Sequence, residues 1–506
     1  MNSPFRASSL LVSLLLLICF ASAAQATTTF RAFLKSEQEV PPRQSPASGT
    51  GTVILNDAET QITVSLVFGG LTSNQTDAHI HSPAQVGVNA PVRFPIGSQG
   101  ETTGSFRDRV FDVTPTDVAN LKAGLMYFNV HSVNFPGGEI RGQIHPAVVI
   151  SEFRFRGPNG IQDEYIELFN DSDAPVTVTS SDGSGGWSLV VLDAGGNPSV
   201  RVPLPDFNVT IPARGHYLAF NNGGYGLGSY ASGDAYFGGD IPDGSAVALF
   251  RTRNPSNFNY GYRMDAVGFN VNNPLYREGF GVPLNFGVTQ NVEHAVVRKM
   301  PSGVTQDIGS NAADFVIVSP LAQTLGNIST GFYFSILGAP GPENTASPVR
   351  RNGILSGSLL DTARPEPSPP NRVRDTTPVP NGQFGTISYR LSFTNNTTQP
   401  VTRLRFRIVE LTTANNRTAA EADLRALTSN DTFVTLTNGS TVLVKGTVLE
   451  GPPSQPAGGG LNSSLAVPTI TLSQPLQPTE KVNVQFLLGV QQEGTLRFFL
   501  KVEALP

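Results

Sequence analysis

The sequence has 506 residues and a formal net charge of −5, and only 14% of its residues are charged. No lysine- or arginine-rich run occurs, which argues against nucleic-acid binding, because neutralising phosphates needs clustered cations. The single cysteine, Cys19, lies near the N-terminus, so neither a disulfide framework nor a thiolate metal site is expected in the rest of the chain.

The first 26 residues have the pattern of a secretory signal peptide. Arg6 gives the positive start, the apolar run "LLVSLLLLICFASAA" follows, and Ala24-Gln25-Ala26 matches a cleavage site. We therefore predict a signal peptide over residues 1–26 and a secreted protein, either extracellular or periplasmic. No later run of 18 apolar residues occurs, so no membrane span is expected after cleavage.

The remaining chain is predicted to be all-β. The sequence contains 51 glycines and 39 prolines, an excess that is typical of short strands joined by turns. Segments of alternating apolar and polar residues recur along it, and its length suggests about three domains. We expect three β-sandwich or Greek-key-like modules in tandem.

The first module is predicted over residues 28–147. Its segments "TVILN", "QITVSLVF" and "YFNVHSVNF" alternate as half-buried strands do. One helix is expected, because Thr114 is a suitable N-cap, Pro115 suits the first helical position and Gly124 ends the pattern.

Four of the six histidines fall within this module. His79 and His81 belong to "AHIH", and alternate residues of a strand point to the same face. Both rings can therefore reach one ion, with His131 as the natural third ligand, whereas His145 follows the strand and is a poorer candidate. Three imidazoles with an open position suit zinc or copper. Two other interpretations stay open: a polar cluster that only stabilises the fold, and a site for acid–base catalysis.

The charged residues near these strands are expected to be structural. Glu139 and Arg141 lie on one face of "EIRGQI", and Arg141 is expected to pair with Glu37 or Glu39 in a structural ion pair that ties the first strand of the module to the last. Asp163 and Glu167, on "DEYIELFN" in the next module, are expected to lie on a solvated face.

The second module is predicted over residues 148–330, where short strand patterns are separated by polar loops. Residues 331–382 are predicted to be a linker. From residue 361 this linker is rich in proline and charge, so we expect it to be extended or disordered and sensitive to proteases. We also expect the domains on either side of it to fold independently.

The third module is predicted over residues 383–506. In "RLRFRIVE" the apolar residues take the core face, which leaves Arg403, Arg405 and Arg407 on a face expected to be wet. Thr418 and Glu421 have the spacing of a capping box, which predicts a short helix that ends at about Leu427.

Three groups of motifs resemble known families. The first module resembles the CHRD domain found in chordin and in many bacterial secreted proteins, through "SEQEVPP" (36–42), "AHIH" (78–81) and "YFNVHSVNFPGGEIRGQI" (127–144). The second is similar to the lamin-tail domain, an immunoglobulin-like sandwich, through "ISEFRF", "DEYIELFN", "GWSL", "RMDAVGFN" and "DIGSNAADFVIVSP". The third resembles immunoglobulin-like sandwiches of bacterial surface proteins in general.

These resemblances imply extracellular modules that bind or scaffold, without a settled catalytic activity. No G-x-S-x-G, H-E-x-x-H or P-loop motif occurs, so no catalytic residue is assigned. The leading hypothesis is a secreted, non-enzymatic protein that binds an extracellular protein or a polysaccharide. The alternative is a metal-binding protein or metal-dependent enzyme centred on His79, His81 and His131.

Overall fold

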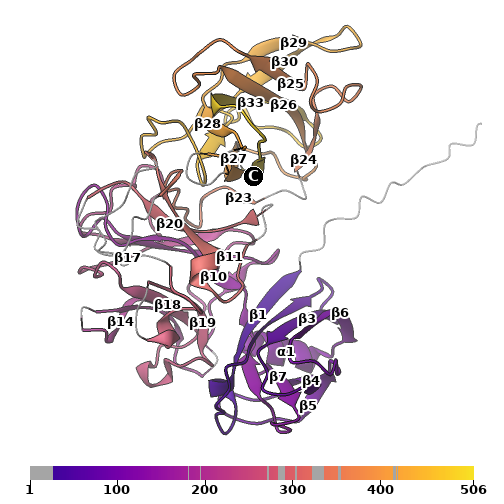
Figure 1. The fold of residues 1–506 in the computed structure, drawn as a ribbon, viewed down its shortest axis with the longest axis vertical. Helices are drawn as coiled ribbons and strands as arrows, with labels where there is room; N and C mark the ends of the chain where they lie inside the picture. Colours follow the sequence, from indigo (N-terminus) through magenta and orange to yellow (C-terminus); the bar gives the residue numbers. More distant parts are fainter. Residues whose placement is uncertain are drawn as a thin grey trace, which may run out of the picture.

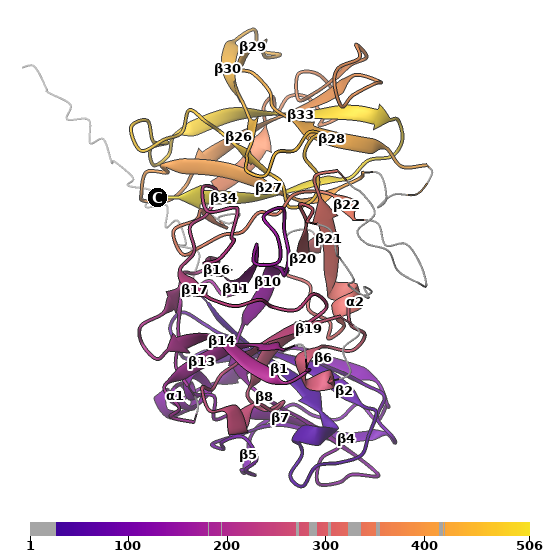
Figure 2. The same cartoon turned by 90° about the vertical axis from the view of Figure 1, so that its left-hand side faces the viewer.

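The computed structural model describes residues 27–506, apart from residues 181, 194, 270–272, 283–290, 302–304, 322–334, 351–354, 414–417 and 419. The expected signal peptide therefore lies outside the described residues. The fold is all-β, as the sequence predicts; the first module lies beside the second towards one end of the molecule, and the third module lies at the other end (Figures 1 and 2). None of the helices in the described part has the length and apolar character that crossing a bilayer requires.

The first module is one nine-stranded sheet that curls around a single core. Its strand order is β5-β4-β7-β8-β1-β2-β3-β6, with β9 paired to β1. The two edge strands approach one another, because the rings of Phe94 and Phe111 lie 5.4 Å apart. Its elements are β1 (Thr28–Lys35), η1 (Ser36–Gln38), β2 (Ser48–Leu55), β3 (Gln61–Gly69), β4 (Gln75–His81), β5 (Val92–Pro95), β6 (Gly104–Asp112), α1 (Pro115–Ala123), β7 (Tyr127–Ser132), β8 (Ile140–Gln143) and β9 (His145–Pro146).

The helix predicted in this module is present as α1, and its caps are those expected. The Thr114 hydroxyl accepts a hydrogen bond from the Asp117 amide, and the Asp117 carboxylate accepts one from the Thr114 amide, which completes a capping box. Gly124 ends the helix at φ 74°, a left-handed conformation that glycine adopts without steric cost.

The second module is a sandwich of a seven-stranded and a four-stranded sheet, ordered β17-β16-β11-β10-β20-β21-β22 and β14-β13-β18-β19, with the small pair β12-β15 beside them. Trp187, the only tryptophan of the chain, lies fully buried in the core between the sheets. Its elements are β10 (Val148–Arg154), β11 (Tyr165–Asn170), β12 (Val176–Thr177), β13 (Gly186–Leu192), β14 (Pro198–Pro205), β15 (Thr210–Ile211), β16 (His216–Asn221), β17 (Ala235–Phe237), β18 (Ala246–Phe250), η2 (Pro255–Asn257), β19 (Arg263–Gly268), η3 (Pro274–Tyr276), β20 (Ala295–Arg298), α2 (Asn311–Asp314), β21 (Phe315–Ser319) and β22 (Ile336–Leu337).

The third module is also a sandwich, with sheets ordered β23-β34-β27-β32-β31 and β24-β26-β33-β30-β29; β25 pairs with β26 and β28 with β33. Its core contains the apolar side chains of β26, β27 and β33. Its strands are β23 (Val349–Arg350), β24 (Leu355–Leu359), β25 (Arg372–Asp375), β26 (Thr386–Asn395), β27 (Arg403–Leu411), β28 (Asp423–Leu427), β29 (Thr432–Thr435), β30 (Thr441–Gly446), β31 (Val448–Leu449), β32 (Ser464–Ala466), β33 (Lys481–Gln492) and β34 (Phe498–Leu505).

The predicted linker is wrong over its proline-rich part. The strands β24 and β25 both pair with β26, so the segment completes a sheet edge of the third module. Buried Asn371 ties the turn between them, because its Nδ2 atom donates to the carbonyl oxygens of Asp361 at 2.9 Å and Arg364 at 3.0 Å. Composition alone did not reveal these hydrogen bonds. Residues 331–334 and 351–354 of the predicted linker lie outside the described residues.

The helix predicted after Thr418 is wrong as well. The Thr418 amide does donate to the Glu421 carboxylate at 2.6 Å, but the chain continues as strand β28, which pairs with β33. Leu424 and Ala426 alternate into the core and are fully buried, so the two-residue period of the apolar side chains decides the structure.

The first and second modules are joined without a linker. Only Ala147 separates β9 from β10, and its backbone bonds to both modules, through Thr29 and Asp171. Across the same junction, the Nε2 atom of His145 lies 2.7 Å from the carbonyl oxygen of Gly261. Burial lowers the pKa of His145 to about 3, so this ring is neutral at physiological pH.

A buried ionic network joins the second and third modules. Glu343 lies between β22 and β23, and its Oε2 atom is 2.9 Å from His216 Nε2 and 3.1 Å from Arg407 Nη2. Its other oxygen contacts Arg405. Both arginines also bind Glu503 on β34. Arg405 and Arg407, predicted on a wet face, are therefore almost fully buried against the second module, and Glu167 of the second module, also predicted on a solvated face, is buried on the other side of the junction.

We predict that Glu343→Gln strongly destabilises this junction. The substitution leaves Arg405 and Arg407 buried with too little negative charge, which costs about 3–5 kcal/mol for a broken buried pair. Urea unfolding followed by Trp187 fluorescence measures the change. Glu493→Gln is the matched control: it breaks an exposed pair with Arg374 and should cost at most about 1 kcal/mol. Equal effects of the two variants would contradict the prediction.

We also predict that His145 makes stability depend on pH. Its folded pKa is about 3 against 6.5 for a free ring, so only the unfolded chain gains a proton as the pH falls below 6.5. The wild-type protein should lose about 2–3 kcal/mol more between pH 7 and pH 4.5 than His145→Gln, which keeps a donor for Gly261. Parallel curves of unfolding free energy against pH would show that the ring is not held neutral.

Candidate metal centre

Strands β4 and β7 bring three histidines to one face of the first sheet. On β4, Ala78 and Ile80 point into the core and are fully buried, which leaves His79 and His81 on the opposite face. On β7 the register places Asn129 opposite His79 and Tyr127 opposite His81. His131 therefore lies on the same face as the pair, diagonal to His79.

The three rings converge on one another. One nitrogen of each ring lies within 4.8 Å of a nitrogen of the other two. The closest pair is His79 Nδ1 and His131 Nε2, which are 3.2 Å apart. Two nitrogens bound to zinc at 2.0–2.1 Å and at a tetrahedral angle lie about 3.3 Å apart, so this spacing fits a shared ion.

The outer nitrogens of the three rings already have acceptors. His81 Nδ1 lies 2.9 Å from the Ala90 carbonyl oxygen, and His131 Nδ1 lies 2.8 Å from that of Pro136. His79 Nε2 lies 3.1 Å from the carboxylate of Asp77. Each outer nitrogen therefore carries a proton, and in a neutral ring the inner nitrogen carries the lone pair. His81 Nε2 is buried and has no hydrogen-bond partner in the described structure.

Burial favours neutral rings here. It lowers the pKa of both His81 and His131, and the neighbouring rings act in the same direction. His81 also stacks on Tyr127, with ring centroids 4.8 Å apart, and the Arg141 guanidinium covers the other face of Tyr127 at 3.4 Å. Tyr127 and Asp77 were not predicted as part of the site. Strand alternation could have indicated Asp77, because it shares a face with His79 and His81.

The comparison with known families adds to this geometry. Residues 30–144 match the model of the CHRD domain. The chain contains a CHRD domain. The match covers almost the whole predicted first module and includes all three histidines, so the resemblance inferred from the motifs is confirmed for this part of the chain. No curated protein and no solved structure matches the chain.

The ion pair predicted between Arg141 and Glu37 or Glu39 is not formed by direct contact among the described residues, although the field of Glu39 acts on Arg141. Fully buried Glu139 accepts hydrogen bonds from the hydroxyls of Ser45 and Ser132 and from the Thr72 amide. Arg141 instead donates to the loop between β4 and β5, at 2.9 Å from the Val88 carbonyl oxygen. The two side chains are used separately because neutral donors satisfy the carboxylate, while Tyr127 and main-chain oxygens hold the guanidinium.

A second carboxylate, that of Glu39, lies beside the cluster on the same face of the sheet, where it contacts Asn129. Burial raises the pKa of Glu39 to about 7, although hydrogen bonds from Asn129 oppose the shift. Its Oε1 atom lies 3.1 Å from Asn129 Nδ2. Asn129 thus binds Glu39 and holds none of the histidine rings, which are oriented by Asp77 and by main-chain oxygens.

The other histidine–carboxylate group of similar compactness belongs to the junction of the second and third modules. Glu167, His216 and Glu343 also bring one ligand atom each within 4.8 Å. However, Arg405 and Arg407 bind Glu343, and the two ring nitrogens of His216 contact Glu167 and Glu343. The two guanidinium groups supply the positive charge that a metal ion would supply, so this group stabilises the junction.

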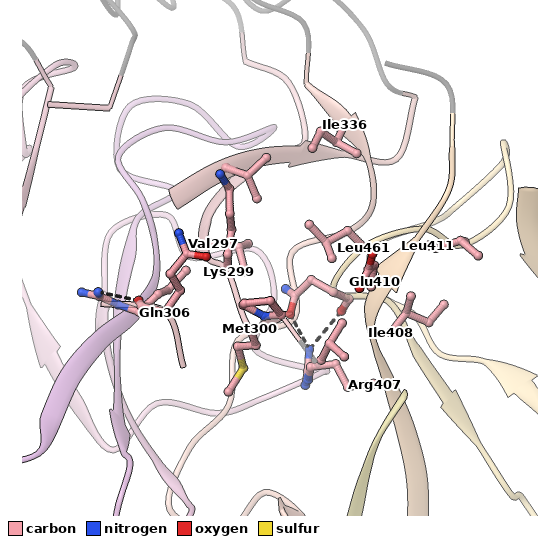
Figure 3. A pocket seen from close by; sticks show the side chains of 15 residues that line it. Val297, Lys299, Met300, Gln306, Ile336, Arg407, Ile408, Glu410, Leu411 and Leu461 are labelled. Carbon is pink, nitrogen blue, oxygen red and sulfur yellow. Dashed lines mark hydrogen bonds between the residues drawn. The ribbon is translucent and has the colours of Figure 1, made fainter. Parts of the chain in front are cut away.

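The same junction contains an apolar cavity of about 240 Å³ (Figure 3). Val297, Ile336, Ile408 and Leu461 contribute to its walls. The polar side chains at its border are held by the protein: Arg407 Nη1 donates to the main-chain and side-chain oxygens of Asn462, each at 3.0 Å. Lys299 donates to a main-chain carbonyl at 2.8 Å. We therefore regard it as packing space beside the ionic network.

Proposed function

We propose that this protein is a secreted, non-enzymatic binding protein whose CHRD domain holds a zinc or copper ion through His79, His81 and His131. The observation that carries the proposal is the direction of the lone pairs. All three outer nitrogens have acceptors, so the remaining nitrogens, which face one another, are the ones that can offer lone pairs to an ion. The two inner nitrogens that are 3.2 Å apart can share either a proton or a metal ion, and the metal content of the protein distinguishes these states.

The position of the site suits binding of an external ligand. The His79 side chain is 14% exposed and that of Asp77 is 46% exposed, so the centre lies at the surface of the domain. Three protein ligands leave one position open on a tetrahedral ion. A donor atom of an extracellular protein or polysaccharide can occupy that position, which links the metal to the binding function.

The two other modules support an extracellular scaffold. We infer that residues 148–330 are a lamin-tail-type, immunoglobulin-like domain and that the third module is immunoglobulin-like, as in bacterial secreted proteins. The motif residues have structural roles that fit this inference: Trp187 of "GWSL" fills the sandwich core, and Asn311 and Asp314 of "DIGSNAADFVIVSP" are fully buried in the turn before β21. The signal-peptide pattern supports secretion.

Replacement of His79 and His81 by Ala tests the metal site. After dialysis against zinc or copper and removal of excess metal, the wild-type residues 27–506 should retain about one equivalent by mass spectrometry, and the double variant almost none. His145→Gln, which removes a histidine of the same domain outside the cluster, is the control and should retain the metal. A wild-type protein without metal, in which the double variant loses about 1–3 kcal/mol of stability, would show that the cluster is only structural.

Asp77 provides a finer test. A carboxylate that accepts the outer N–H of a ligating histidine orients the ring and raises its basicity. Asp77→Asn should therefore weaken zinc affinity by about 10–100-fold, measured by competition with a chelating dye, while the stoichiometry stays the same. Asp57→Asn, at an exposed turn of the same domain, is the control. Unchanged affinity in Asp77→Asn would remove the carboxylate from the site.

A further inference from the structure

A cleft of about 450 Å³ lies between the CHRD domain and the second module. Strands β1, β2 and β3 form one wall, and the segments around η2, η3 and α2 form the other. Its volume lies within the range of small-molecule sites, and domain interfaces are preferred places for such sites. The metal centre is elsewhere, since none of its three histidines lines the cleft.

Glu278 and Arg263 border this cleft and pair with each other at 3.1 Å, but among the described residues each keeps one polar atom without a partner, and the Lys35 ammonium group beside them is unpaired. The Glu278 side chain is 1% exposed, and its Oε2 atom has no hydrogen-bond partner in the described structure. Arg263 is 5% exposed, and its Nε–H also lacks an acceptor there. Lys35 forms no ion pair or hydrogen bond with any described residue, and burial lowers its pKa. Leaving a buried polar group unpaired is costly, so this set indicates an occupant that supplies both acceptors and donors.

Both walls of the cleft carry aromatic surface, Phe33 on β1 and Tyr260 on the opposite wall. The Arg263 guanidinium lies 5.8 Å from the ring centroid of Phe33 and 5.1 Å from that of Tyr260. Both rings are half-buried and line the cleft. Sugar rings bind proteins by placing a C–H face against an aromatic ring while their hydroxyls form hydrogen bonds, and the two walls together offer both features.

The charge balance of the cleft is positive. Lys35, Arg263 and Arg277 line it together with a single carboxylate, Glu278. Burial, followed by the field of Asp307, raises the pKa of Glu278 well above its usual range, so that this group contributes little negative charge. An anionic ligand is therefore favoured over a neutral or cationic one.

We propose that this cleft binds an acidic saccharide, a sugar ring that carries a carboxylate. The carboxylate accepts from Lys35 Nζ and Arg263 Nε, a ring hydroxyl bonds to Glu278 Oε2, and a sugar face lies against Phe33. The proposal depends on the extracellular location proposed above and specifies the polysaccharide partner, but it does not depend on the metal.

Titration calorimetry with a trimer of galacturonate tests the proposal on residues 27–506. The wild-type protein should bind the trimer, and its neutral methyl ester, which matches it in size and linkage, should not bind. Lys35→Ala should weaken binding about tenfold or more, because it removes a charged hydrogen bond. Lys481→Ala, an exposed lysine of the third module, is the matched control and should bind as the wild type does.

Phe33→Leu separates stacking from charge. It keeps an apolar side chain, so the domain should fold, but it removes the flat ring and should also weaken binding. No binding of the trimer, equal binding of the ester, or full affinity in Lys35→Ala would each overturn the proposal, and waters would then satisfy the three polar groups. These outcomes leave the metal content unchanged, so a failure here is distinguishable from failure of the proposed metal site.

Discussion

The arrangement of the second and third modules depends on one buried carboxylate. Glu343 lies on the segment that connects the two sandwiches, and its oxygens bind His216 on one side and Arg405 and Arg407 on the other. Burial alone would raise the pKa of Glu503, but the two arginines hold it well below its usual range. Neither sandwich could bury its share of these charges alone, because an uncompensated buried ion is very unfavourable. The ionic network therefore requires both modules in one relative orientation.

In the CHRD domain, one face of strand β4 contributes to the core and the opposite face carries two of the histidines of the site. Ala78 and Ile80 pack in the core, and strand alternation then directs His79 and His81 to the opposite face. Main-chain oxygens of the loops after β4 and β7 then select the ring nitrogens that carry protons. Because the core holds the strands, the histidines can be varied without removing the apolar contacts that stabilise the domain.

Local patterns predicted much of this from the sequence. Alternation placed the three histidines on one face, and the capping residues of α1 were identified individually. The errors arose where a distant segment decides the outcome. Arg405 and Arg407 look solvated in "RLRFRIVE" because the partner surface belongs to another module. The proline-rich segment looks disordered because the hydrogen bonds of Asn371 and the open edge of β26 are non-local features. Arg141 looked like a partner for a carboxylate, but the face of Tyr127 holds it.

The direct passage from β9 to β10 has a consequence for avidity. A tether of one residue, Ala147, has almost no conformational freedom, so surfaces on the CHRD domain and on the second module are presented at a fixed spacing. A polymer that reaches both surfaces would then bind the second as an intramolecular step, without the entropy that a flexible connection would cost. The same rigidity means that a repeat of the wrong length could not engage both, so the junction would select ligands by the period of their repeats.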